Sequence, residues 1–271
     1  MSTFLLIGGT GKVGTRLAER LRTERAAVRI ASRTGGDVRF DWRDHATYAS
    51  AVAGIDGVFI VGPGSATDWS PLLTEFLAVA AAAGVSRVAL LSARGVEFSK
   101  DGAVALAERA IVTGPLEWTI LRPSHFAQNF TEAMFVPVDG EVAAPVADGA
   151  EPFVDVLDIA EVAARVLLTG SWPNQFIDIS GPTALTFDEA VAVLAAELGR
   201  PVVFRNESAE EHIERLRAAG TPEGYITWRM AMLGGIRSGR DAYVSDGVER
   251  VLGRSATSFE DWARREAGAT R

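Results

Sequence analysis

Glycines between residues 8 and 14 follow a spacing that suits phosphate binding. Gly9, Gly11 and Gly14 match the pattern G-x-G-x-x-G and come directly after an apolar run at residues 4–7. Glycine permits a tight turn and close approach of the backbone to a pyrophosphate, while the N-terminus of a following helix supplies N–H groups and partial positive charge. A purely structural turn is the alternative. We expect a nucleotide to contact Gly8, Thr10, Gly11, Lys12, Val13 and Gly14.

The second β-rich run ends in a hydroxyl and a guanidinium, Ser32 and Arg33. An NAD site usually carries an acidic residue here to hold the ribose 2′-hydroxyl. Arginine can instead bind a 2′-phosphate through paired hydrogen bonds, so this pair favours NADP(H). The alternative is that Arg33 is a solvated loop residue. Further cofactor contacts are expected at the ends of later strands, from Asp41, Trp42, Gly62, Pro63 and Ser92, although Trp42 suits core packing equally well.

Short apolar runs that alternate with helical stretches must position these residues. The runs are nearly continuous in apolar residues, which is typical of parallel strands covered on both faces. Val13, Leu17 and Leu21 form one helical stripe, and another helix is expected to open with Ser70 as its cap and to close at Gly84. The alternation predicts an α/β fold, a Rossmann-type doubly wound parallel sheet. The expected strands are Phe4–Ile7, Ala27–Ala31, Val38–Phe40, Gly57–Val61, Arg87–Leu91, Trp118–Leu121 and Gln175–Ile179.

The pattern changes beyond about residue 125, where capping boxes announce helices. These boxes explain most acidic residues of the C-terminal half as helix caps rather than catalytic groups. We expect an NADP-binding Rossmann core over residues 1–130. Residues 131–271 should form a small, mostly helical substrate-binding lid together with strands and helices that complete the core. The boxes are Asp158-x-x-Glu161, Thr186-x-x-Glu189, Ser208-x-x-Glu211 and Asp246-x-x-Glu249.

Composition excludes several classes of function. A net charge of −8 without a basic stripe argues against nucleic-acid binding. The absence of cysteine excludes disulfides, thiol nucleophiles and thiolate metal sites, and the spacing of His45, His125 and His212 forms no metal-ligand set. No apolar run reaches the roughly 18 residues of a membrane span. A cytoplasmic protein with a small-molecule substrate is expected, and the oligomeric state is left open.

Motifs along nearly the whole chain resemble the NmrA-like branch of the atypical short-chain dehydrogenase/reductases. Within that branch the chain looks most like the ergot-alkaloid festuclavine and agroclavine dehydrogenases, which implies NADPH-dependent reduction of an iminium. It is less similar to the type-two quinone oxidoreductases and the redox-sensing regulators. The motifs that carry the resemblance are Gly8-Gly9-x-Gly11-Lys12, Phe40-Asp41-Trp42, Leu90-Leu91-Ser92-Ala93, Leu121-Arg122-Pro123-x-x-Phe126-x-x-Asn129-Phe130, Phe153-Val-Asp155-Val-x-Asp158-Ile-Ala160, Gly181-Pro182 and Val248-Glu-Arg-Val-Leu-Gly253.

The chain departs from conventional short-chain dehydrogenases at the catalytic helix. Those enzymes use a Tyr-x-x-x-Lys pair there, in which the tyrosine protonates the carbonyl oxygen. Here residues 101–112 contain neither, because tyrosine occurs only at 48, 225 and 243 and lysine only at 12 and 100. Reduction of a ketone creates an alkoxide that needs a proton, whereas reduction of an iminium creates a neutral amine. The absence of the Tyr-Lys pair favours an iminium, imine or conjugated carbonyl as the hydride acceptor. A non-catalytic NADP sensor and a quinone reductase are the alternatives.

Ser92 and His125 are the side chains we expect to assist catalysis. Ser92 follows the fifth strand, where it could contact substrate or nicotinamide ribose, or simply cap the strand. His125 is the candidate proton donor, with a structural histidine as the alternative. Asn129 could orient substrate or brace its loop. Aromatic residues expected to line the substrate site are Trp69, Phe126, Phe130 and Trp228, whereas Phe153 and Met232 are expected in the core.

Overall fold

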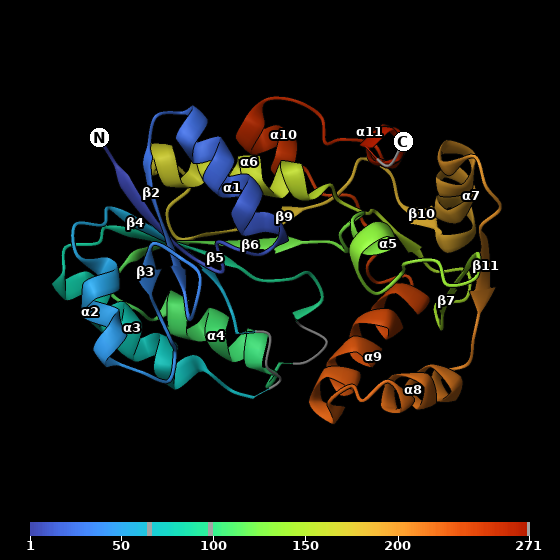
Figure 1. The fold of residues 1–271 in the computed structure, drawn as a ribbon, viewed down its shortest axis with the longest axis horizontal. Helices are drawn as coiled ribbons and strands as arrows, with labels where there is room; N and C mark the ends of the chain where they lie inside the picture. The colour runs from blue at the N-terminus through green and yellow to red at the C-terminus, as the bar shows by residue number, and fades with distance from the viewer. Residues whose placement is uncertain (64–66, 97–99, 270–271) are drawn as a thin grey trace.

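A parallel sheet forms the centre of the molecule in the computed structural model, which describes residues 1–63, 67–96 and 100–269 (Figure 1). Its seven strands run in the order β3-β2-β1-β4-β5-β6-β9, so the direction of winding reverses between β1 and β4. The predicted doubly wound sheet is therefore confirmed, and ligands bind such sheets at this reversal. The strands are β1 (Thr3–Ile7), β2 (Ala27–Ser32), β3 (Val38–Arg39), β4 (Gly57–Val61), β5 (Arg87–Leu91), β6 (Glu117–Pro123) and β9 (Gln175–Ile179).

Helices cover both faces of this sheet because side chains alternate along each strand. Phe4 and Leu6 of β1 pack into one hydrophobic core, and Leu5 and Ile7 pack into another. In Figure 1 the first face lies under α1 (Lys12–Thr23), α6 (Val156–Thr169) and α10 (Gly247–Leu252). The opposite face carries α2 (Ala46–Val52), α3 (Ser70–Ala82) and α4 (Ala103–Val112). Ser70 is the first residue of α3 rather than its cap, which is Trp69.

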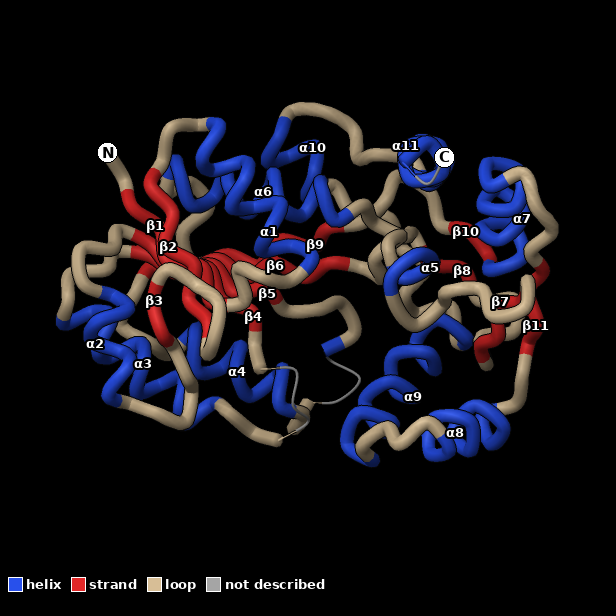
Figure 2. The backbone as a smooth tube through the Cα atoms, viewed as in Figure 1, coloured by secondary structure: helices blue, strands red, loops and turns tan. Residues whose placement is uncertain are grey.

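The C-terminal part packs beside the sheet around a third core, which is rich in phenylalanine. Phe135 and Phe187, for example, meet edge to face with ring centroids 4.8 Å apart. Figure 2 separates this part, with its two small sheets, from the central sheet. Its elements are α5 (Asn129–Glu132), β7 (Glu141–Ala144), β8 (Ala150–Glu151), β10 (Leu185–Thr186), α7 (Phe187–Leu198), β11 (Val203–Asn206), α8 (Ala209–Ala218), α9 (Glu223–Arg237) and α11 (Phe259–Ala269).

Two of the expected capping boxes are confirmed and two are wrong. Thr186 and Ser208 each accept a hydrogen bond from the N–H of the glutamate three residues on, which bonds back to the cap. Asp158 lies inside α6, because the cap of that helix is Asp155. Asp246 occupies the cap position of α10, but its side chain makes no capping hydrogen bond. A buried network therefore replaces the local role that we expected for Asp158.

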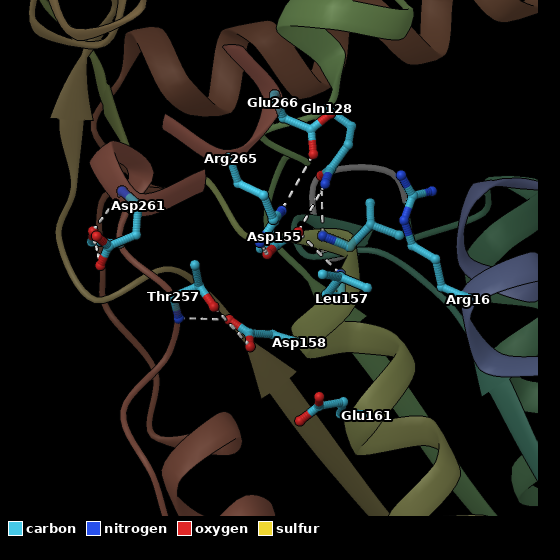
Figure 3. A network of polar contacts seen from close by, with 12 residues as sticks. Arg16, Gln128, Asp155, Leu157, Asp158, Glu161, Thr257, Asp261, Arg265 and Glu266 are labelled. Carbon is cyan, nitrogen blue, oxygen red and sulfur yellow. Dashed lines mark hydrogen bonds and ion pairs between the residues drawn. The ribbon is translucent and has the colours of Figure 1, made fainter. Parts of the chain in front are cut away.

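That network joins distant parts of the chain around the start of α6 (Figure 3). The Asp155 carboxylate accepts hydrogen bonds from Gln128 Nε2 at 2.8 Å and from Arg265 Nη1 at 2.9 Å. Asp158 accepts one from the backbone N–H of Thr257 at 2.7 Å. These bonds connect the loop after β6 and the segment leading into α11 with the Rossmann core.

Candidate functional site

The glycine turn between β1 and α1 has the geometry of a cradle for a phosphate group. Gly8 adopts a left-handed backbone with φ of +86°, and its carbonyl accepts the N–H of Gly11 at 3.1 Å. A β-carbon on Gly14 would lie 2.2 Å from the Gly8 oxygen, so this glycine is needed for packing of helix against strand. A β-carbon on Gly11 would meet only the Gly8 oxygen, at 3.4 Å. Gly11 therefore leaves open space beside the start of α1, which is the side from which a pyrophosphate would approach.

The other residues of the expected nucleotide turn differ in exposure and in charge. Thr10 is exposed, whereas the Val13 side chain is buried in the core, so only the backbone of Val13 can face a ligand. Lys12 Nζ lies 3.7 Å from a carboxylate oxygen of Glu132. Burial lowers the pKa of Lys12, and Glu132 only partly offsets this effect. Arg16 Nη2 lies 3.5 Å from the same carboxylate, so two cations stand at the first turns of α1.

The end of β2 holds the expected phosphate-selective pair. The Ser32 hydroxyl accepts hydrogen bonds from the N–H groups of Thr34 and Gly35, at 3.4 and 3.3 Å, and so orders the turn that follows. Arg33 is exposed and forms no ion pair with the residues that the structure describes. Asp41 is half-buried and accepts a hydrogen bond from the N–H of Arg43 at 3.0 Å. This end of the sheet therefore presents a cation that is free to bind a phosphate.

Trp42 and Trp69 lie in the core beneath this site rather than at its surface. Their rings are 5.1 Å apart, and both side chains are buried among Phe40, Tyr48 and Phe76. A β-carbon on Gly62 would lie 2.8 Å from the Trp69 ring, so Gly62 makes room for that ring. Of the loop 62–67, positions 64–66 lie outside the described residues, and Pro63 is exposed two residues after the end of β4. Trp42 and Trp69 therefore serve core packing and offer no exposed ring to a ligand.

Ser92 is held by an acidic residue that sequence reasoning did not assign to the site. Ser92 follows β5, and its hydroxyl donates a hydrogen bond of 2.5 Å to Glu108 of α4. Arg122, at the end of β6, donates to the same carboxylate from Nε at 2.9 Å and from Nη2 at 2.5 Å. The Ser92 and Glu108 side chains are buried, and Arg122 is partly exposed. The signal in the sequence was a single acid on the apolar face of α4, one turn from Ala105 and from Ile111.

His125 lies near the same edge and pairs with the buried Glu151 of β8. Its Nδ1 is 3.4 Å from Glu151 Oε1, and its backbone N–H donates to that oxygen at 2.9 Å. Burial alone would lower the pKa of His125, but the charge of Glu151, with help from Asp241, outweighs burial and raises the pKa. Glu151 therefore favours the protonated form of the His125 ring, which is the form that a proton donor needs.

The remaining expected substrate residues differ in exposure. Phe130 is buried in the C-terminal core, with its ring centroid 5.0 Å from that of Phe153, and Asn129 is buried at the start of α5. Phe126 is half-buried, and Trp228 is half-buried on α9 beside Tyr225. Phe126 and Trp228 are thus the members of this group with aromatic surface open to a ligand. Met232 and Phe153 are buried, as expected.

Two of the three tyrosines have structural hydrogen bonds of their own. Tyr48 OH donates to the carbonyl of Trp42 at 2.7 Å, and burial, with lesser help from nearby carboxylates, raises its pKa to about 12. Tyr243 OH donates to Asp178 at 3.1 Å. Within the described chain, the Ser92 hydroxyl bonds only Glu108, so neither a tyrosine nor a lysine assists it. The part of the chain that the structure describes contains no cluster of three potential metal ligands and no helix long and apolar enough to cross a membrane.

Comparison with known proteins identifies relatives over nearly the full length of the chain. A family model described as NAD(P)H-binding matches residues 8–169. An uncharacterized oxidoreductase, YesF, of Bacillus subtilis is 33% identical over 97% of this chain and 94% of its own length. Agroclavine dehydrogenase of Claviceps fusiformis is 27% identical over 96% of both chains. These matches extend from the glycine turn through the C-terminal part.

Solved structures share the same fold at lower identity. The NADPH-dependent quinone oxidoreductase QOR2 of Escherichia coli, complexed with NADPH, superposes with a TM-score of 0.82 at 19% identity, covering 97% of this chain and 99% of that one. The negative transcriptional regulator NmrA, in complex with NAD, gives a TM-score of 0.77 at 15% identity, covering 99% and 97%. At these identities the similarity establishes the fold.

Proposed function

We propose, from the premise that this chain belongs to the NAD(P)H-binding, NmrA-like family of oxidoreductases, that it reduces a carbon–nitrogen double bond. The acceptor is an iminium or imine of a small hydrophobic cyclic molecule. A bound NADPH supplies the hydride. The family relationship carries the oxidoreductase chemistry, and the arrangement around Ser92 supports the choice of acceptor.

The observation that carries the proposal is the Glu108 carboxylate on α4, the helix on which conventional short-chain dehydrogenases carry their proton donor. Hydride transfer to a ketone leaves negative charge on oxygen, which a neighbouring donor must neutralise. Here the Ser92 hydroxyl already donates to Glu108 at 2.5 Å and has no second proton to give. Hydride transfer to an iminium removes a positive charge and requires no donor. A site that offers the Ser92 oxygen as a hydrogen-bond acceptor, with the Glu108 carboxylate beside it, suits reduction of an iminium.

Residues of the nucleotide site support NADPH over NADH. The cradle formed by Gly8, Gly11 and Gly14 fits a pyrophosphate, because a side chain at Gly11 would fill the open space beside α1. Arg33 is exposed at the end of β2, without a described ion-pair partner, and can bind the 2′-phosphate. Ser32 orders the turn that carries it.

Reduction of a quinone is a second candidate, and the His125–Glu151 pair favours it. A quinone becomes anionic on accepting a hydride, and an imidazole whose protonated form is favoured by Glu151 could protonate the new oxygen. This route uses His125 as an acid, whereas the iminium route does not.

Oxidation of NADPH, followed by absorbance, tests the proposal against a matched set of acceptors. The set contains a cyclic imine, an N-methyl iminium, a quinone and a ketone of similar ring size. We expect the iminium compounds to be reduced fastest and the ketone slowest. Preferential reduction of the quinone, lost in His125→Ala, would replace the proposal with the second candidate. Tight NADPH binding without turnover of any acceptor would support a nucleotide sensor instead.

A further inference from the structure

We propose that Ser92 accepts a hydrogen bond from the substrate nitrogen, and that Glu108 and Arg122 are positioning residues that prevent it from donating one. The inference rests on the proposed function and narrows the substrate to protonated imines that carry an N–H group. N-alkylated iminium ions lack that hydrogen and would lose this contact.

The direction of the Ser92–Glu108 hydrogen bond follows from Arg122. An arginine side chain stays protonated in proteins and can only donate. Arg122 donates to Oε1 of Glu108 at 2.9 Å and to Oε2 at 2.5 Å, so both oxygens of this carboxylate are acceptors and the group is ionised. The 2.5 Å bond between Ser92 and Oε1 must then use the serine proton.

Ser92 consequently presents only lone pairs to a third partner. Its backbone N–H is already bonded to the carbonyl of Leu121 at 2.8 Å, which fixes the residue at the carboxyl end of β5. The Glu108 side chain is 7% exposed, so little solvent can compete for its oxygens. The Arg122 guanidinium lies over the Phe176 ring, 4.1 Å from its centroid, which limits the movement of the whole group. A carbonyl oxygen placed at Ser92 would face another acceptor, whereas an N–H group would face its complement.

The chemical step balances without a proton from the protein. The substrate carbon accepts a hydride, the π electrons of the C=N bond move to nitrogen, and NADP⁺ is left. The nitrogen keeps its proton and becomes a neutral secondary amine. Ser92 accepts a hydrogen bond from that N–H group before and after transfer, and its own proton remains on the Glu108 side.

Ser92→Ala tests the inference when two substrates are compared in the same protein sample. One is a cyclic imine, assayed below the pKa of its iminium, and the other is the N-methyl iminium of the same ring. A charge-assisted hydrogen bond is worth roughly ten- to hundred-fold in kcat/KM, so we expect a loss of that order for the N–H substrate and little change for the N-methyl compound. The ratio of kcat/KM for the N–H substrate to kcat/KM for the N-methyl compound does not depend on the fraction of folded protein.

Glu108→Ala tests the positioning role. Removal of the carboxylate takes away the acceptor of the Ser92 proton, which is then free to turn toward substrate. We expect the preference for the N–H imine over a matched ketone to shrink, with folding checked by circular dichroism. Ser124→Ala is the matched control, because this buried hydroxyl at the same edge donates to the carbonyl of Pro152 at 2.6 Å and should leave both substrate ratios unchanged.

Equal losses for both iminium substrates in Ser92→Ala, together with weaker NADPH binding, would overturn the inference and assign Ser92 to the cofactor. Equal losses with unchanged NADPH binding would overturn it as well, because the N–H group would then make no difference. In either case the wild-type enzyme still reduces iminium ions. Failure of the proposed function looks different, since wild-type protein would then reduce neither compound.

Discussion

Two glycines of the nucleotide turn, three residues apart, should respond in opposite ways to the same substitution. In Gly14→Ala the new β-carbon would lie 2.2 Å from the Gly8 oxygen and 2.6 Å from the Gly9 Cα. Both neighbours are backbone atoms, so α1 must move away from β1. Overpacking of this kind costs about 1–3 kcal/mol of unfolding free energy.

In Gly11→Ala the β-carbon would meet the Gly8 oxygen at 3.4 Å, which is ordinary contact. The backbone of Gly11, with φ of −84° and ψ of 177°, is open to any residue. Loss of glycine at a helix cap costs about 1 kcal/mol or less. The methyl group would, however, occupy the space from which a pyrophosphate approaches the N–H groups of α1. We expect NADPH affinity to fall at least about tenfold, or ~1.4 kcal/mol, and further in Gly11→Val.

Urea unfolding without nucleotide and calorimetric titration with NADPH separate the two effects. Gly11→Ala should unfold close to the wild type yet bind NADPH weakly. Gly14→Ala should unfold at a lower urea concentration than the wild type. The fraction of this variant that is folded should bind NADPH with an affinity close to that of the wild type. If Gly11→Ala bound NADPH as tightly as the wild type, the turn would not be the phosphate cradle, and the assignment of the cofactor site would be wrong.

Three further predictions concern the cofactor, pH dependence and stability. Arg33→Ala should weaken NADPH binding by roughly tenfold and leave NADH binding unchanged, because the arginine is expected to contact only the 2′-phosphate, which NADH lacks. Calorimetry that showed the same loss of affinity for both nucleotides would exclude a role of Arg33 in binding the 2′-phosphate. The pKa of His125 is raised in the folded state, so its pairing with Glu151 should stabilise the protein fully below about pH 6.5 and progressively less as pH rises through the folded pKa. Glu151→Gln should remove this decline and lower the pKa of the His125 ring in an NMR titration, and an unchanged pKa would contradict the assignment. Asp155→Ala should cost about 1–3 kcal/mol of unfolding free energy, because it removes the cap of α6 and the hydrogen bonds from Gln128 and Arg265. Asp246→Ala is the control, because Asp246 occupies a cap position without a side-chain hydrogen bond. In the same urea titration it should cost under about 0.5 kcal/mol.

Local patterns predicted the architecture and the nucleotide turn. The strand runs Gly57–Val61, Arg87–Leu91 and Gln175–Ile179 were predicted with their observed bounds. The capping boxes at Thr186 and Ser208 formed as expected. Strand burial, helix capping and glycine turns involve residues close together in the chain, so their spacing specifies them.

Only the tertiary structure decided which distant side chains meet. Ser92 and Glu108 are 16 residues apart, and Asp158 and Thr257 are 99 apart. Asp158 matched a capping pattern, yet the fold buried it against the C-terminal segment, where the backbone N–H of Thr257 needed an acceptor. Trp69 was expected to line the substrate site and Trp42 suited the cofactor site or core packing equally well, yet the packing of α2 and α3 on the sheet placed both side chains in the core. The sequence alone predicted the glycine turn that we propose as the nucleotide cradle, because its glycines lie close together in the chain. The group formed by Ser92, Glu108 and Arg122 depends on contacts between β5, α4 and β6, and spacing within one element does not determine such contacts.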